Sequence, residues 1–329
     1  MSGAPETVEL VRAGGPHVAG LMGRVEERLR ADAAGHGPAL AEHAGETIAA
    51  GGKRLRPLLV LLAAGELADE DAAETAVRSA AAVELVHSAT LVHDDVLDSA
   101  SLRRGRPTVV ARAGRGMATA AGDLLFSRAF AALTGAPAGD RAEAVRILSD
   151  ACSALARGEL LQRADAWDAS ITRERYLLRC ELKTARLFEA ACALGALAAD
   201  ESELELGDFG RRIGLAFQLL DDVLDVSGPA SRTGKHRGTD LLDGTVTLPF
   251  IAARERDERL AALDPRTIDA PEVAEEVCDR VEATGALDEV RALALELVDE
   301  ARAALPAGLD ARRREALELV AGGVVARYA

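Results

Sequence analysis

A long apolar run that ends in acids decides the fold: AAAVELVHSATLVHDDVLD, residues 80–98. Its small and aliphatic side chains, without Gly or Pro, predict a buried helix that carries carboxylates at its end. A second helical run, FGRRIGLAFQLLDDVLD at residues 209–225, ends in the same five letters. We call these two copies of DDVLD the acidic words, and we expect two core helices to present them.

The acidic words indicate a metal site. The first and fifth aspartates of each word lie on one helix face, where like charges cost about 0.2–0.5 kcal/mol and oppose the helix dipole. Mg²⁺ takes oxygen ligands and would offset that repulsion. One word alone could equally be a solvated acidic face, but the identical second copy favours two facing walls of one metal site. The predicted ligands are Asp94, Asp98, Asp221 and Asp225.

The composition favours an all-α protein. The 329 residues are 49% hydrophobic and only 3% aromatic, and Ala, Leu, Glu and Arg are abundant. A net charge of −15 argues against nucleic-acid binding and against docking on anionic lipid. With no Gly/Ser-rich linker, we expect a flexible arm over residues 1–16 and a single domain over residues 17–329.

Periodicity and breakers place the helices along the chain. The expected helices cover residues 17–33, 39–50, 58–68, 74–98, 122–133, 142–161, 172–197, 203–226, 252–263, 271–284, 287–305 and 311–325.

A cytoplasmic location is expected. The N-terminus lacks the pattern of a secretory signal, and no apolar run approaches the roughly 20 residues that span a bilayer. The four cysteines are widely spaced and show no CxxC pair, so free buried thiols are predicted. They are Cys152, Cys180, Cys192 and Cys278.

Cationic groups accompany the acidic words. Residues 53–57, KRLRP, precede a helix start, residues 103–106 read RRGR, and a Gly-rich segment around residues 234–238 carries GKHRG. Free backbone N–H groups with Lys and Arg make an anion site, and Arg matches phosphate oxygens in two-point contacts. The first stretch could also be an ordinary basic turn, and His87 a satisfied core residue. Together with Mg²⁺ and apolar helices, these groups indicate a diphosphate site above an apolar tunnel. Motifs of nucleotide kinases and zinc proteases are absent.

These pieces resemble the trans-isoprenyl diphosphate synthases, or polyprenyl synthetases. The matching stretches are GGKRLRP at 51–57, HSATLVHDDVLD at 87–98, RRGRPT at 103–108, KT at 183–184, FQLLDDVLD at 217–225 and GKHRGTDLLDG at 234–244. The resemblance implies a single large helical bundle of the isoprenoid synthase type, with a central active-site cavity. It also implies a homodimer that joins isopentenyl diphosphate head to tail to an allylic diphosphate.

The resemblance further implies a role for each matching residue. Two or three Mg²⁺ ions would bind Asp94, Asp98 and Asp221, with Asp225 in support. The allylic diphosphate would contact Arg103, Lys183 and Lys235, and isopentenyl diphosphate would contact Lys53, Arg56, His87 and Arg104. Thr184 and Gln218, with Lys183, would act beside the reacting carbon. One departure stands out, because Thr245 occupies a position where many relatives have a lysine.

Product length is predicted from the residues before the first word. Five residues of helix rise about 7.5 Å, so Ala89 and Thr90 lie near the first part of the prenyl tail. A bulky aromatic residue near this depth limits short-chain relatives. The small side chains here predict a product of C20 or longer, with C30 or above as the expected range.

Three other readings compete with an active synthase. A terpene cyclase would replace the second word and line its cavity with aromatics, of which this chain has few. A non-catalytic partner of a hetero-oligomeric synthase would have lost charged site residues, which are present here. A plain helical bundle without a site is disfavoured by the repeated word.

Overall fold

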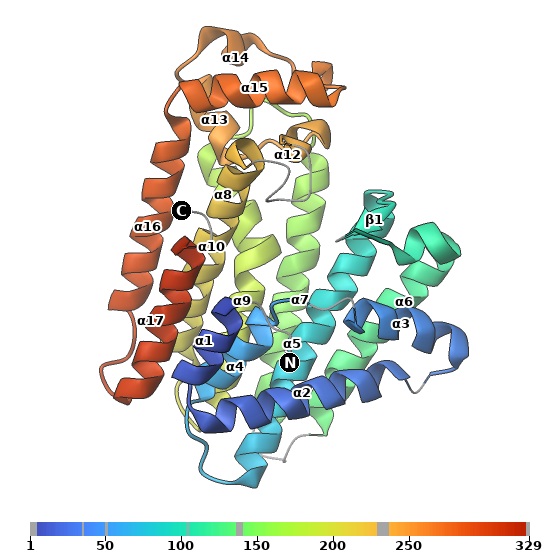
Figure 1. The fold of residues 1–329 in the computed structure, drawn as a ribbon, viewed down its shortest axis with the longest axis vertical. Coiled ribbons are helices and arrows are strands. Elements are labelled where there is room, and N and C mark those ends of the chain that lie inside the picture. The colour runs from blue at the N-terminus through green and yellow to red at the C-terminus, as the bar shows by residue number, and fades with distance from the viewer. Residues whose placement is uncertain are drawn as a thin grey trace. The chain divides into compact units, whose positions relative to one another are not determined.

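The computed structural model describes residues 5–34, 36–49, 52–103, 105–135, 141–228 and 237–326. Within these ranges the chain is built of helices, and its only strands are β1 (Leu102–Arg103) and β2 (Arg106–Pro107), which pair antiparallel (Figure 1). This confirms the predicted all-α class. No helix in the same ranges is long and apolar enough to cross a bilayer.

The described chain forms two compact units, each assembled from separate stretches. Unit 1 comprises Met1–Cys152, Leu187–Gly210 and Leu305–Val320, and unit 2 comprises Ser153–Arg186, Arg211–Ala304 and Ala321–Ala329. The helices not introduced below are α3 (Pro38–Ala49), α4 (Leu55–Ala64), α9 (Arg186–Ala198), α12 (Thr239–Leu242), η2 (Pro265–Thr267), α16 (Ala286–Ala303) and α17 (Ala311–Ala326). That residues 17–329 are one domain stays a prediction.

Unit 1 is organised around α5 (Glu70–Leu97), the helix that ends in the first acidic word. Its start is capped by Asp69, whose side chain accepts a hydrogen bond from the Ala72 amide at 2.9 Å. The helix packs along α6 (Val109–Thr134), and its residues 80–83 are fully buried. Because these side chains are small, α5 can serve as a central core helix close to its neighbours.

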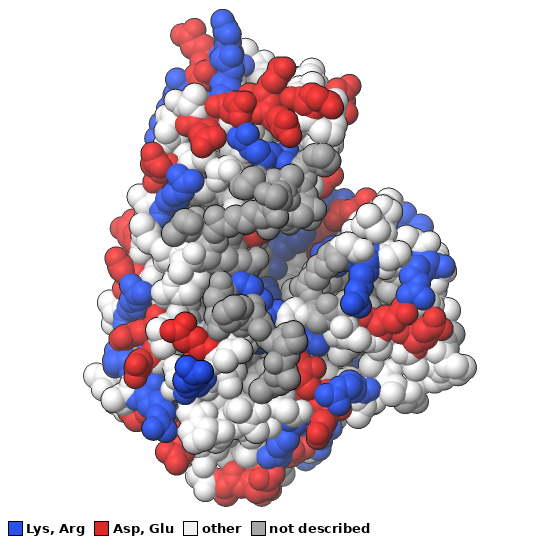
Figure 2. All heavy atoms as spheres, viewed as in Figure 1, with Lys and Arg blue, Asp and Glu red and all other residues white. Residues whose placement is uncertain are grey.

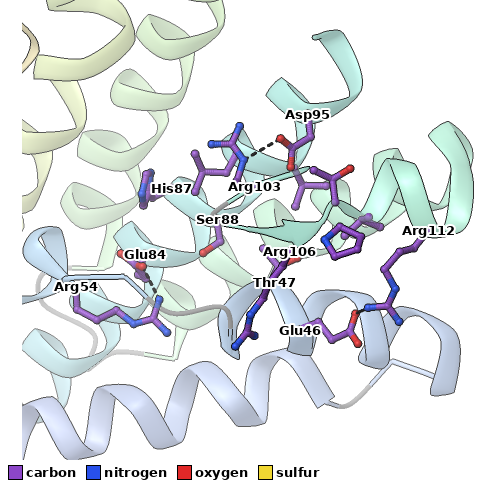
Figure 3. Close-up of a pocket in the computed structure, with 15 residues that line it drawn as sticks. Glu46, Thr47, Arg54, Glu84, His87, Ser88, Asp95, Arg103, Arg106 and Arg112 are labelled. Carbon is purple, nitrogen blue, oxygen red and sulfur yellow. Dashed lines mark hydrogen bonds and ion pairs between the residues drawn. The ribbon is translucent and has the colours of Figure 1, made fainter. Parts of the chain in front are cut away.

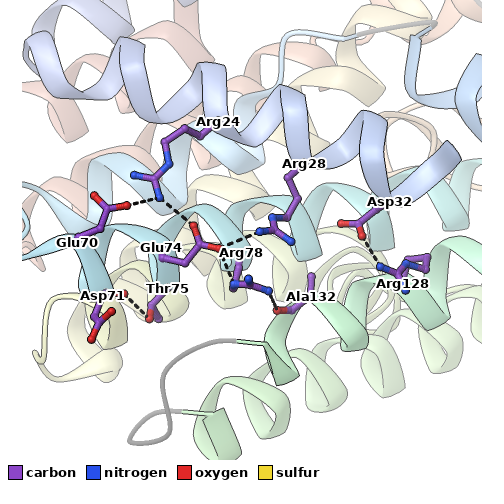
Figure 4. Close-up of polar contacts among 10 residues, drawn as sticks. All are labelled: Arg24, Arg28, Asp32, Glu70, Asp71, Glu74, Thr75, Arg78, Arg128 and Ala132. Atoms are coloured by element: carbon purple, nitrogen blue, oxygen red, sulfur yellow. Dashed lines mark hydrogen bonds and ion pairs between the residues drawn. The ribbon is translucent and has the colours of Figure 1, made fainter. Parts of the chain in front are cut away.

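Ion pairs connect α2 (Pro16–Ala34) to this core (Figure 4). Arg24 and Arg28 of α2 both bind Glu74 of α5, at 2.8 Å each. Further along, Arg128 of α6 binds the buried Asp32 of α2 at 2.5 Å. A single exposed pair contributes little, but several pairs that share carboxylates fix the register of α2.

Residues Pro5–Ala13 form helix α1, which corrects the expected arm without regular structure. Leu10 of this helix is buried. Just beyond it, Gly14 lies against Leu62 of α4 so closely that an added Cβ would collide with the Leu62 side chain. Tertiary packing therefore supports a segment whose weak periodicity did not predict a helix.

Two expected helix boundaries were wrong. Helix α6 begins at Val109 rather than at residue 122, capped by Thr108 and kinked at Gly114, which has φ of 82°. The helix expected over residues 252–263 is divided into α13 (Leu248–Arg254) and α14 (Glu258–Ala262). Asp257 separates them, because its side chain caps α14 by accepting from the amide of Leu260 at 3.0 Å.

The helix expected over residues 172–197 is helical from residue 173 onward, but it contains a π-helical turn. It runs as α8 (Arg173–Cys180), which starts at the Thr172 cap, and then changes to a π-helical turn, η1 (Glu181–Ala185). Such π turns insert an extra residue into a helix and occur frequently at functional sites. This turn carries both Lys183 and Thr184.

The surface of unit 2 carries an acidic face on α15 (Pro271–Ala283), visible over that helix in Figure 2. Its exposed acids are Glu272, Glu275, Glu276, Asp279 and Glu282. Arg237 pairs with Asp279 at 2.8 Å and partly offsets their charge. This helix therefore accounts for part of the net negative charge.

Candidate active site

In the first acidic word, the middle aspartate is held by the protein. Asp95 is only 5% exposed, and its Oδ1 accepts a hydrogen bond from Nε of Arg103 at 2.8 Å. Asp94 is half-buried and Asp98 is exposed. Arg103, predicted to contact a diphosphate, therefore binds an acid of the word itself in this structure.

The second word, in α10 (Glu203–Ser227), has the same arrangement. Its middle aspartate, Asp222, is 3% exposed and accepts hydrogen bonds from the Tyr176 hydroxyl at 2.5 Å and from Nε2 of Gln218 at 2.8 Å. Asp221 is exposed, and Asp225 is half-buried. The protein thus engages the middle acid in both words. That the two words face each other across one metal site stays a prediction.

The surroundings of Asp222 have opposing effects on its pKa. Burial, together with the nearby Asp240 and Asp221, raises the pKa of Asp222 to about 8. The hydrogen bonds from Tyr176 and Gln218 oppose this, because donors favour the carboxylate. Burial and the same carboxylate raise the pKa of Tyr176, so its hydroxyl keeps the proton that it donates.

The outer aspartates of the words fit a hard divalent cation by their chemistry and exposure. They offer carboxylate oxygens, and Mg²⁺ commonly takes one or two carboxylates, several waters and a substrate phosphate. Across the ranges that the structure describes, no group of three or more His, Cys, Asp or Glu residues forms a ready-made cage. The outer aspartates therefore offer the donor chemistry that such an ion prefers.

Lys183 is placed by its contact with α7 (Arg141–Ala164). Its Nζ donates to Oε2 of Glu159 at 2.5 Å, and Glu159 also binds Arg163 at 2.7 Å. Burial opposes ionisation of Glu159, but the charges of Lys183 and Arg163 lower the pKa of this carboxyl. Lys183 is therefore a cation held in place by a partly buried carboxylate.

Thr184 and Gln218 lie together in unit 2, as partners in one hydrogen bond. The Thr184 hydroxyl donates to Oε1 of Gln218 at 2.7 Å. Because Gln218 also donates to Asp222, its amide orientation follows from both contacts. The sequence placed both residues beside the reacting carbon, and the structure brings them into contact.

A cavity of about 230 Å³ lies in unit 1 beside α5 (Figure 3). His87 and Arg103, two predicted substrate contacts, line it together with Arg54 and Glu84. Arg54 donates to Glu84 at 2.7 Å inside the cavity wall. Arg54, Arg103 and Arg112 on this wall are already paired with acids, so an anion that enters would have to compete with those acids.

Arg54 was not assigned a role from sequence, although it lies between two predicted site residues. It begins α4 in the left-handed region, with φ of 49°. Its guanidinium binds Glu84, Glu26 at 2.8 Å and the Ile48 carbonyl at 2.7 Å. Burial raises the pKa of Glu84, while the Arg54 charge lowers it. Arg54 therefore joins the start of α4 to three other helices, α2, α3 and α5.

The predicted isopentenyl diphosphate contacts Lys53, Arg56 and His87 differ in their surroundings. Lys53 is exposed, and His87 is half-buried. Arg56 lies 4.5 Å above the Phe188 ring, and burial lowers the pKa of Arg56 to about 10. Among the described residues, no group accepts a hydrogen bond from its Nε. These three assignments stay predictions.

Four further predicted residues have different outcomes. Arg104 and Lys235 lie outside the described residues. Ala89 is fully buried, whereas Thr90 is half-buried and donates to the His87 carbonyl at 2.8 Å. Thr90 precedes Asp94 by four residues and so shares its helix face, while Ala89 lies further around the helix.

The sequence reading missed Tyr176. It precedes Lys183 by seven residues, which places the two on nearly the same helix face two turns apart. This spacing from Lys183, in a helix already predicted to carry a site residue, could have identified Tyr176 from the sequence. Its partner could not be read, because Asp222 is 46 residues away in the sequence.

Comparisons with known proteins identify the family of this chain. The family model described as Polyprenyl synthetase matches residues 38–281. The octaprenyl diphosphate synthase of Escherichia coli is 37% identical over 277 residues, covering 82% of this chain and 84% of that protein. Component 2 of the heptaprenyl diphosphate synthase of Geobacillus stearothermophilus is 41% identical over 292 residues, covering 85% and 87%. The crystal structure of a decaprenyl diphosphate synthase from Rhodobacter capsulatus aligns with a TM-score of 0.88 at 33% identity, over 98% and 99% of the two chains. The chain therefore belongs to the polyprenyl synthetase family, the trans-isoprenyl diphosphate synthases, and is an enzyme that transfers prenyl groups.

Proposed function

We propose that this protein condenses isopentenyl diphosphate with an allylic diphosphate, head to tail and with Mg²⁺. The allylic C1–O bond breaks and diphosphate leaves with the bonding electrons. The C4 atom of isopentenyl diphosphate then bonds to C1, and loss of a C2 proton restores an allylic diphosphate. The product is a trans-polyprenyl diphosphate of C20 or longer, with C30 or above as the expected range.

The observation that carries this proposal is the repeated arrangement of the acidic words. In each, the middle aspartate is buried and bound by a protein side chain. The first and fifth keep more contact with solvent, and Asp225 also accepts a hydrogen bond from the Asp240 amide at 3.2 Å. Two carboxylates per word suit Mg²⁺ ions whose remaining ligands come from water and a diphosphate. Bound there, Mg²⁺ would stabilise the charge that develops on the departing diphosphate.

The side chains of η1 support ionisation of the allylic substrate. The ammonium of Lys183 would attract the leaving diphosphate and orient it, held by Glu159 at 2.5 Å. The Thr184 hydroxyl directs its proton to Gln218, so the oxygen lone pairs remain for the electron-poor carbon. Lys183 and Thr184 thereby act on opposite charges of the same separating pair.

Product length is assigned to the end of α5. Ala89 and Thr90 leave the space below the first acidic word without a bulky side chain, and Thr90 shares the face of Asp94. The names of the relatives from Escherichia coli and Rhodobacter capsulatus, octaprenyl and decaprenyl diphosphate synthase, support a long product.

The test supplies the purified protein with Mg²⁺, isopentenyl diphosphate and allylic primers of C5, C10, C15 and C20, and separates the products by chromatography. We expect elongation that stops when EDTA removes the metal. Products that end at C15 would contradict the length assignment. Cyclised hydrocarbons in place of linear diphosphates would indicate a terpene cyclase.

A second candidate follows from the Geobacillus stearothermophilus relative, whose name makes it component 2 of a synthase. The protein would then need a different subunit in order to act. If the protein forms no product with any primer, under conditions in which a known synthase is active, this candidate is favoured. We propose a cytoplasmic homodimer as the working assembly, and light scattering of the active protein would show its mass.

A further inference from the structure

A chain of hydrogen bonds runs through unit 2 from a buried tyrosine to the predicted catalytic side chains. Tyr176 is fully buried in α8 and donates to Oδ2 of Asp222 at 2.5 Å. Gln218 donates to the other oxygen of Asp222 at 2.8 Å. Thr184 donates to Gln218 at 2.7 Å. The chain joins α8 and the adjoining η1 to α10, so it connects two stretches that are separated in sequence.

The direction of each hydrogen bond follows from the groups. The Gln218 amide nitrogen can only donate, so it donates to Asp222, and the Tyr176 hydroxyl donates to the other oxygen of the same acid. The Gln218 amide oxygen is then the acceptor for the single proton of Thr184. Asp222 therefore sets the orientation of Gln218, and Gln218 sets the orientation of the Thr184 hydroxyl.

We propose that Tyr176 is a positioning residue for prenyl transfer. It acts through Asp222 and Gln218 to hold the Thr184 oxygen toward the electron-poor carbon. This role rests on the proposed function, and it assigns the middle acid of the word to alignment.

The first word supports the division of labour between its acids. Asp95, its middle acid, is also buried, but its partner is the guanidinium of Arg103. Arg103 is 36% exposed, whereas Tyr176 is fully buried. The middle acid of the second word therefore has the more rigid partner. A rigid partner is what the positioning of a group beside a reacting carbon requires.

The test is Tyr176→Phe, which removes one oxygen and keeps the ring. Loss of a hydrogen bond to a carboxylate changes a free energy by roughly 1.5–3 kcal/mol, so we expect kcat to fall about 10-fold to 100-fold. The KM values for isopentenyl diphosphate and for the allylic primer should stay within about twofold, because the chain contains no diphosphate-binding group. Unchanged kcat, or a raised KM with normal kcat, would overturn the proposal.

A matched control separates positioning from stability. Thr172→Ala removes the cap of the same helix, α8, where Thr172 accepts from the Arg175 amide at 3.3 Å. It should lower the melting temperature while kcat stays near that of the wild type. If Thr172→Ala lowers kcat as much as Tyr176→Phe at equal loss of stability, the effect is structural and the proposal is wrong.

A double-mutant cycle tests the connection itself. Tyr176→Phe and Thr184→Val act on one chain, so the double variant should be no slower than the slower single variant, within about threefold. If the reductions in kcat of the two single variants multiply in the double variant, the two residues act independently, and the proposal is overturned. A wild type without prenyl transfer would instead contradict the proposed function, so the two failures are distinguishable.

Discussion

An added Cβ on Gly158 would lie 2.6 Å from the backbone nitrogen of Lys183 and 2.8 Å from its Cα. Position 158 therefore lets α7 touch the backbone of the π-helical turn directly. The next residue, Glu159, then reaches the Lys183 ammonium at 2.5 Å. The absence of one side chain thus places the turn that carries Lys183 and Thr184.

Gly158→Ala should destabilise the protein by about 1–3 kcal/mol, because the Cβ meets backbone that cannot rotate away. Thermal unfolding measures the change. Gly20→Ala is the control: no neighbouring atom lies within 4 Å of its Cβ position in α2, so it should stabilise by up to about 1 kcal/mol. Equal melting temperatures for wild type and Gly158→Ala would show that α7 can move away from the turn without cost.

Asp94→Ala and Asp221→Ala should each abolish turnover while the helical circular dichroism stays normal. Each removes one of the two carboxylates on the predicted metal face of its word, and so leaves the ion with a single ligand from that word. Asp279→Ala is a matched control, because this acid on α15 is 69% exposed and far from either word in sequence. Near-normal activity of either word variant would remove the metal role.

Arg54→Met should cost about 3–5 kcal/mol of stability, since it leaves the buried Glu84 without its partner. The side chains of the pair are only 10% and 6% exposed. Arg24→Met breaks more exposed pairs with Glu70 and Glu74 and should cost less than about 1 kcal/mol. Urea unfolding compares the two variants. A smaller loss for Arg54→Met than for Arg24→Met would contradict this ranking.

Thr90→Phe should shorten the product, because an aromatic ring one turn before Asp94 would close the space for the growing tail. Ala89→Phe should shorten it too, but position 89 is fully buried, so this variant should also lose about 1–3 kcal/mol through overpacking. Chromatography measures the product length of each variant. Thr90→Val is the control, and its product should be as long as that of the wild type. Wild-type product from both Phe variants would remove the tunnel assignment.

Local signals predicted the elements well where periodicity was strong. The core helix expected over residues 74–98 is α5, and the one expected over residues 203–226 is α10. They failed where packing or a cap decides the boundary. Helix α1 depends on tertiary packing, which buries Leu10, and the break at Asp257 depends on a side-chain cap within a stretch of helical composition.

The sequence by itself determined the all-α class and the family, and it predicted which residues carry the chemistry. Helix periodicity, composition and motif letters are local properties, so they can be read without coordinates. Only the tertiary structure decided how the aspartates within each acidic word differ. The letters are identical, but Asp95 is held by a nearby arginine and Asp222 by a tyrosine 46 residues away. Burial and hydrogen-bond partners are set by packing between distant segments, and no local pattern encodes them.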